Sequence, residues 1–122
     1  ERPFSENDVT SDENRYQRTS NLIKTNENLA VGGLSIGWAY ESIKRIRKFR
    51  KKDYITRIQC PTLLLNATKD KLINANLNRK LCSKIPDITI ADIEGEHELL
   101  MEKDIIRKQA WNEMDRFLTK FL

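Results

Sequence analysis

The decapeptide Pro61–Asp70, PTLLLNATKD, decides the fold. A proline followed by a short, unbroken apolar run predicts a strand over residues 62–67, of the kind that is buried on both faces of a parallel sheet. Asp70 follows three residues after the end of this run. In α/β proteins the chemically active side chains gather just beyond the carboxyl ends of the strands. Asp70 is therefore a candidate site residue.

The segment that follows repeats this arrangement. Apolar residues spaced four apart predict a helix over about 74–85, and ITIADI predicts a second strand over 88–93. Gly95 ends that strand, and His97, the single histidine of the chain, lies four residues beyond it. A periodic apolar pattern predicts a last helix over about 103–122. The order strand, helix, strand, helix predicts that the two strands are parallel.

Asp70 and His97 occupy equivalent positions after neighbouring strands, so their loops are expected to meet at one edge of the sheet. There the Asp70 carboxylate can accept a hydrogen bond from the imidazole Nδ1–H, which leaves Nε2 free to take a proton from a nucleophile. Taken alone, an Asp at this position is usually a turn residue or a helix N-cap, and a His after a glycine is most often an ordinary loop residue. Their joint placement favours the acid and the base of a Ser-His-Asp triad.

The first part of the chain, residues 1–52, contains no convincing strand. Thr10-Ser11-Asp12-Glu13 is a capping-box signature, with Thr10 as the N-cap, and predicts a helix that runs to about residue 26. Gly32-Gly33 interrupts the chain. A second helix is predicted over about 35–50.

The second helix combines an apolar face with a basic one. Its apolar residues recur at intervals of three and four, which predicts one buried stripe; they are Ile36, Ala39, Tyr40, Ile43, Ile46 and Phe49. The stretch Lys44–Lys52, KRIRKFRKK, holds seven basic residues in nine and accounts for the net charge of +4. Three interpretations are open: a solvated helix face, a patch attracted to anionic lipid headgroups, or a nucleic-acid contact. The last is disfavoured, because no helix-turn-helix or zinc-finger spacing accompanies the cluster.

The remaining features indicate a soluble chain in a reducing compartment. No apolar run approaches the roughly 18 residues of a membrane span. Cys60 and Cys82 are expected to pack as small hydrophobic residues, with neither a disulfide nor a zinc site. The aromatic side chains expected in the core are Trp38, Tyr40 and Trp111. We expect a cytoplasmic location, with contact at the membrane periphery as the alternative.

Two strands cannot form a closed, doubly wound sheet. Each buried parallel strand needs neighbours and a cover on both faces. We therefore expect an α/β fold with an incomplete sheet, whose other strands lie upstream of Glu1.

Three stretches of the chain resemble one family. "IQCPTLLLNATKDKL" resembles the α/β-hydrolase segment in which an apolar strand delivers the triad acid, and "IADIEGEHELLME" resembles the segment in which the next strand delivers the triad histidine. Residues 8–50, with "TSDENRYQR" and "NLAVGGLSIGW", resemble the helical cap of the bacterial lysophospholipase and monoacylglycerol-lipase-like serine hydrolases.

The resemblance implies a helical cap over 1–52, followed over 53–122 by the last two parallel strands and last two helices of the α/β-hydrolase core. It makes Asp70 the acid and His97 the base. The implied reaction is hydrolysis of a lipid ester, such as a lysophospholipid or a monoacylglycerol, through a seryl acyl-enzyme. It implies no metal or organic cofactor. The expected partners are the upstream remainder of the hydrolase core and an anionic membrane surface, with no nucleic acid.

Ser35 matches the sequence pattern of a serine nucleophile, but we do not expect it to be one. Gly33–Gly37, GLSIG, matches G-x-S-x-G, and with Asp70 and His97 it even gives the chain order Ser, Asp, His. A nucleophile elbow must leave a buried strand, however, and residues 26–31 offer only a short apolar stub. We expect Ser35 to be a helix N-cap, the nucleophile to lie upstream, and this chain alone to be inactive. The alternatives are a self-contained hydrolase that uses Ser35, and a non-catalytic module that binds membrane or nucleic acid through 44–52.

Overall fold

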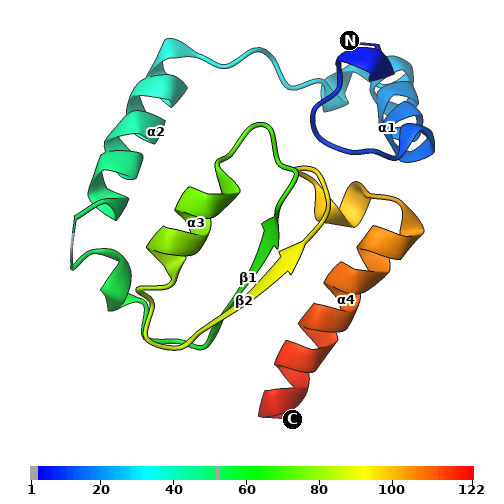
Figure 1. The fold of residues 1–122 in the computed structure, drawn as a ribbon. Coiled ribbons are helices and arrows are strands. Elements are labelled where there is room, and N and C mark those ends of the chain that lie inside the picture. The colour runs from blue at the N-terminus through cyan, green and yellow to red at the C-terminus, as the bar shows by residue number, and fades with distance from the viewer. Residues whose placement is uncertain (1–2, 52) are drawn as a thin grey trace.

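The computed structural model describes residues 3–51 and 53–122, with helices on both sides of a small sheet (Figure 1). The helices and strands are α1 (Glu13–Thr25), α2 (Ile36–Phe49), β1 (Thr62–Ala67), α3 (Ala75–Cys82), β2 (Ile88–Ile93) and α4 (Asp104–Leu118). Short 3-10 turns connect them, among them η4 (Leu99–Met101) between β2 and α4. The predicted elements are thus all present. The α/β class, with an incomplete sheet, is confirmed.

Strands β1 and β2 pair in parallel, from Thr62 opposite Ile88 to Ala67 opposite Ile93. This confirms the prediction from the alternation of strands and helices. Because the first and last residues of the two strands are paired with each other, both strands end at the same level. Their carboxyl ends point towards α1 (Figure 1). The loops that follow the two strands therefore begin side by side.

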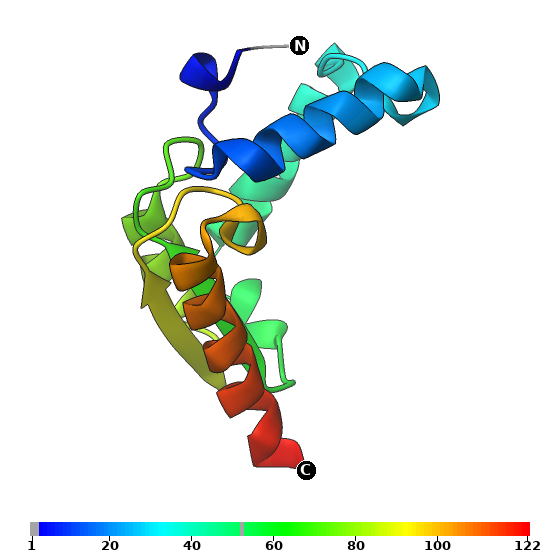
Figure 2. The ribbon, with the colours of Figure 1, turned by 90° about the vertical axis from the view of Figure 1, so that its right-hand side faces the viewer.

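The two faces of the sheet differ in character. On the face covered by α4, the last residues of the two strands, Ala67 and Ile93, pack against Leu99 and Ala110. These four residues form the main buried cluster. On the face of α3 the partners are polar: Asn66 donates a hydrogen bond to Asp92 over 2.8 Å, and Asp92 pairs with Arg79 of α3. Figure 2 shows α4 lying along one side of the strands.

The prediction that β1 is buried on both faces was wrong. Only Asn66 and Ala67 are buried, and the first four residues of the strand are half-buried. The reason is that β1 has a single neighbour among the described residues, because the sheet there consists of β1 and β2 alone.

The buried stripe predicted for the second helix was also wrong. No residue of α2 is buried, and Ile36 is 91% exposed. The predicted core positions of Trp38 and Tyr40 are exposed as well, because α2 lies at the outer edge of the molecule, away from the sheet (Figure 1). The stripe exists as an apolar face that is largely exposed among residues 3–51 and 53–122, although Phe49 at its end packs against the Tyr54 ring at 5.6 Å. Lys52, the last residue of the basic cluster, lies outside the described residues.

Trp111 was predicted in the core and is instead 45% exposed. The row of α4 that meets the sheet passes through Ile106 and the fully buried Ala110. Trp111 follows Ala110 by one residue, which turns its side chain about 100° round the helix, away from the sheet.

The first helix begins two residues later than predicted. Its N-cap is Asp12, whose side chain accepts a hydrogen bond from the Arg15 N–H, and not Thr10. The Thr10 hydroxyl is used elsewhere, because it donates to the Met101 carbonyl over 2.8 Å. A contact between distant parts of the chain has therefore displaced the expected cap.

Three smaller expectations can be compared with the structure. Both cysteines are free thiols, but Cys60 is exposed and does not pack as a small hydrophobic residue. Within the described ranges, no helix combines the length and the apolar character needed to cross a bilayer. The same ranges contain no cluster of side chains suited to hold a metal ion.

Candidate active site

Asp70 is held at the end of β1 by its own loop. Its Oδ1 accepts hydrogen bonds from the backbone N–H groups of Leu72 and Ile73, over 2.8 and 3.0 Å. This is the turn role that the sequence allowed for an isolated Asp. The side chain is only 8% exposed, and its second oxygen remains available.

His97 lies in the loop between β2 and η4 and supplies the partner of that second oxygen. Its Nδ1 lies 2.7 Å from Oδ2 of Asp70, so the structure brings the two predicted residues together. An ionised carboxylate can only accept, so Nδ1 carries the proton and donates it. The lone pair of the imidazole then lies on Nε2, which is the arrangement of a general base. The His97 side chain is 32% exposed and can meet a reactant.

The environment of Asp70 favours its ionised form. Burial raises the pKa of this carboxyl, but the hydrogen bonds from His97, Ile73 and Leu72 more than compensate, and its pKa lies below the ordinary value. Asp70 is therefore a carboxylate at neutral pH, suited to stabilise a positive charge on His97.

The two loops are joined by backbone hydrogen bonds beyond the last strand pair. Thr68 N–H donates to the Ile93 carbonyl over 2.9 Å, and Lys69 N–H donates to the Gly95 carbonyl over 3.0 Å. Gly95 also lets the His97 loop pack closely against the core. A Cβ placed on it would lie 2.5 Å from Leu99 Cδ2 and 2.9 Å from Ile106 Cγ2, so any side chain at this position would force these two residues to move.

Two acidic residues that precede His97, Glu94 and Glu96, are paired with lysines of the opposite loop. Lys69 lies 3.3 Å from Glu94, and Lys71 lies 3.7 Å from Glu96. These ion pairs cross from the Asp70 loop to the His97 loop. They offset the negative charge that the sequence places around the imidazole.

Ser35 takes the structural role predicted for it. Its Oγ accepts a hydrogen bond from the Trp38 N–H over 3.1 Å, which makes it the N-cap of α2. No strand precedes it in the described part of the chain. The start of α2 also lies away from the His97 loop in both ribbon views. The structure therefore does not bring Ser35 together with Asp70 and His97.

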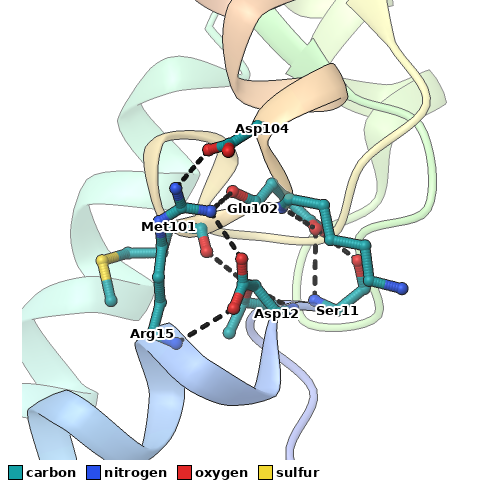
Figure 3. Close-up of polar contacts among 8 residues, drawn as sticks. Ser11, Asp12, Arg15, Met101, Glu102 and Asp104 are labelled. Atoms are coloured by element: carbon teal, nitrogen blue, oxygen red, sulfur yellow. Dashed lines mark hydrogen bonds and ion pairs between the residues drawn. The ribbon is translucent and has the colours of Figure 1, made fainter.

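Glu102 belongs to the surroundings of His97 and was not predicted. It is 0% exposed. Its Oε1 accepts a hydrogen bond from the Glu96 N–H over 2.8 Å, and its Oε2 accepts from Ser11 and from its neighbour Lys103 (Figure 3). The signal in the sequence is weak: a glutamate directly after the apolar run Leu99–Met101, where a buried position is expected.

Comparison with known proteins finds a family and a relative that match this chain. The sequence pattern of the family described as "Serine aminopeptidase, S33" matches residues 2–104, a range that includes both Asp70 and His97. A protein of Haemophilus influenzae named "Probable lysophospholipase L2" is 26% identical over 113 residues, which cover 92% of this chain. No solved structure matches the chain.

The chain spans 36% of the length of that relative. The family match covers well over half of the 122 residues, and it coincides with a parallel strand pair that carries an Asp-His hydrogen bond at its carboxyl ends. The chain therefore belongs to the serine aminopeptidase S33 family of α/β-hydrolases.

Proposed function

We propose that the protein is a carboxylic-ester hydrolase that cleaves a lysophospholipid or a monoacylglycerol with a Ser-His-Asp triad. Asp70 is the acid and His97 the base. The observation that carries the proposal is the 2.7 Å hydrogen bond from His97 Nδ1 to Asp70, at the edge of the sheet where the two strands end.

The residues of this chain have defined tasks in such a reaction. His97 Nε2 takes the hydroxyl proton of the serine as the serine oxygen attacks the ester carbonyl, and then delivers that proton to the departing alcohol. Asp70 fixes the tautomer and stabilises the imidazolium that exists between these two transfers. Water, activated in turn by His97, hydrolyses the acyl-enzyme and regenerates the serine.

The nucleophile of the proposed triad is a serine N-terminal to the 122 residues. Ser35 is the one residue here that matches the elbow pattern, and its hydroxyl is occupied as a helix N-cap. The relative's greater length leaves room for an elbow strand and for the oxyanion donors. In this proposal residues 1–52 are a helical cap over the site, and residues 53–122 are the last part of the core.

The substrate class rests on the relative, whose name describes it as a probable lysophospholipase. The basic side chains of α2 support a phospholipid substrate as well, because anionic headgroups attract such a cluster. These side chains are Lys44, Arg45, Arg47 and Lys48. The family description names an aminopeptidase instead. Hydrolysis of an aminoacyl amide in preference to a lipid ester is therefore the outcome that would redirect the proposal.

The test uses the protein that contains this chain together with its N-terminal remainder. Release of fatty acid from lysophosphatidylcholine and monoacylglycerol is compared with hydrolysis of an aminoacyl amide. We expect His97→Ala to lower kcat by about three orders of magnitude or more, because the triad acts as a unit. Ser35→Ala, the matched control, should leave kcat within about twofold of the wild type.

A fluorophosphonate probe locates the nucleophile in the same protein. We expect the adduct on a serine upstream of Glu1. An adduct on Ser35, or unchanged ester hydrolysis in the His97→Ala variant, would contradict the proposed triad.

A further inference from the structure

We propose that Glu102 is a positioning residue for His97. In this proposal its buried carboxylate ties the loop of the base to the segment that begins the first cap helix. The inference rests on the proposed function, because it takes His97 as the general base.

On the side of the base, the backbone is held on both flanks of His97. Glu96 N–H donates to Glu102 Oε1 over 2.8 Å, and Glu98 N–H donates to the Val9 carbonyl over 2.8 Å. The imidazole itself is oriented by Asp70. His97 is thus fixed by its two neighbouring peptide groups as well as by its ring, and Glu102 supplies one of these three restraints.

On the side of the cap, Glu102 holds the residues that lead into α1. Its Oε2 accepts hydrogen bonds from the Ser11 N–H, over 3.2 Å, and from the Ser11 hydroxyl. Its own carbonyl accepts from Arg15 Nη1 over 2.5 Å, and Arg15 also pairs with Asp12 and Asp104 (Figure 3). The same residue therefore contacts the His97 loop and the first turn of α1.

The donor set requires a carboxylate at this position. The donors to the Glu102 side chain are the N–H groups of Glu96, Ser11 and Lys103 and the Ser11 hydroxyl. Burial raises the pKa of Glu102, but these hydrogen bonds outweigh it, and the pKa lies below the ordinary value. An amide of the same shape would turn an NH2 group towards N–H donors, so Glu102→Gln removes an acceptor without removing volume.

The first measurement reads the imidazole of His97 directly. His97 is the single histidine of the 122 residues, so the imidazole nitrogen and Nδ1–H signals in an NMR spectrum of this chain belong to it. We expect Glu102→Gln to broaden or shift the Nδ1–H signal and to increase the share of the other tautomer. Glu94→Gln is the matched control: it removes the same charge from the same loop, but its side chain is 81% exposed, and its spectrum should match the wild type.

The second measurement uses the complete hydrolase. We expect Glu102→Gln to lower kcat by about tenfold to a hundredfold while KM changes by less than about threefold, because a misplaced base slows the chemical step without weakening substrate binding. Ser11→Ala, a milder change that removes one hydrogen bond from the same carboxylate, should lower kcat in the same direction by about fivefold. This second variant keeps the test valid if Glu102→Gln does not fold.

Two results separate the proposals. If Glu102→Gln or Ser11→Ala lowers only the thermal midpoint, while the His97 signals and kcat of the folded protein stay at wild-type values, Glu102 is merely structural and the inference is overturned. If His97→Ala keeps full activity, the proposed function fails, while the NMR comparison still reports whether Glu102 positions the ring.

Discussion

Gly95 shows how little space separates the His97 loop from the core. None of the described glycines, Gly95 included, has a positive φ. Glycine is therefore favoured at position 95 by the lack of space for a side chain and not by its backbone conformation. We predict that Gly95→Ala destabilises the protein by about 1–3 kcal/mol, because the new methyl group overlaps Leu99 and Ile106. Urea denaturation followed by circular dichroism measures the change.

The control for this prediction is Gly33→Ala. A Cβ at Gly33 meets nothing within 4 Å, so the free energy of unfolding should stay within about 0.5 kcal/mol of the wild type. Equal effects of the two substitutions would show that the packing around Gly95 is not as tight as described.

Asp70 makes stability depend on pH in a defined direction. Its folded-state pKa is below the ordinary value of 3.8, so its contribution is fully present above that pH and is lost as the pH falls through the lower, folded value. We predict that Asp70→Asn is less stable than the wild type at pH 7, and that the difference narrows below about pH 4. Urea titrations at the two ends of this range measure it; a constant difference would contradict the assigned hydrogen bonds.

At this scale the sequence predicted that Asp70 and His97 come together, but it did not predict the residues that hold them in place. Asp70 and His97 could be found because each directly follows a strand, which is a local pattern. Glu102 could not, because its partner Ser11 is 91 residues away and a single sequence carries no sign of that pairing.

Among the elements, periodicity predicted the helices well and their surroundings poorly. The second helix was expected over 35–50 and occupies Ile36–Phe49, with Ser35 as its cap. Apolar spacing identifies which face of a helix is apolar, but it does not say whether another part of the molecule covers that face. For α2 the described residues do not.

The basic side chains of α2 lead to a prediction of their own. If the helix binds an anionic lipid surface, replacing Lys44, Arg45 and Lys48 by glutamine should weaken binding to phosphatidylserine-containing vesicles by about 1 kcal/mol per charge. Vesicle co-sedimentation at two salt concentrations measures the loss and its salt dependence. The matched control removes exposed cations of α4, such as Lys108, and should have little effect; binding that does not change in the α2 variant returns the cluster to a solvated helix face.

At the scale of the whole molecule, the alternation of strands and helices predicted the parallel pair, since a crossover helix joins β1 to β2. The extent of burial could not be predicted, because it depends on how many neighbours each strand has, which the alternation of elements does not specify.

We predict that the 122-residue chain alone does not hydrolyse monoacylglycerol and does not react with a fluorophosphonate at Ser35. In the proposed triad Asp70 and His97 assist a serine and oxyanion donors that lie upstream of this chain, so the two residues alone have no reaction to assist. Mass spectrometry of the probe-treated chain and a fatty-acid release assay measure this. Turnover by the chain would mean that Ser35, or another serine within it, can act as the nucleophile.

The hydrogen bonds from Thr10 and Ser11 to Met101 and Glu102 also bear on how the protein folds. Each joins residues 91 positions apart, so their formation closes almost the whole chain into one loop, at an entropic cost of about 4 kcal/mol. Contacts of such separation form late. On the ribosome, the start of α1 must wait until residue 102 has been synthesised before it can find its partner. The His97 loop and the residues that lead into α1 should therefore become ordered in the same final step of folding.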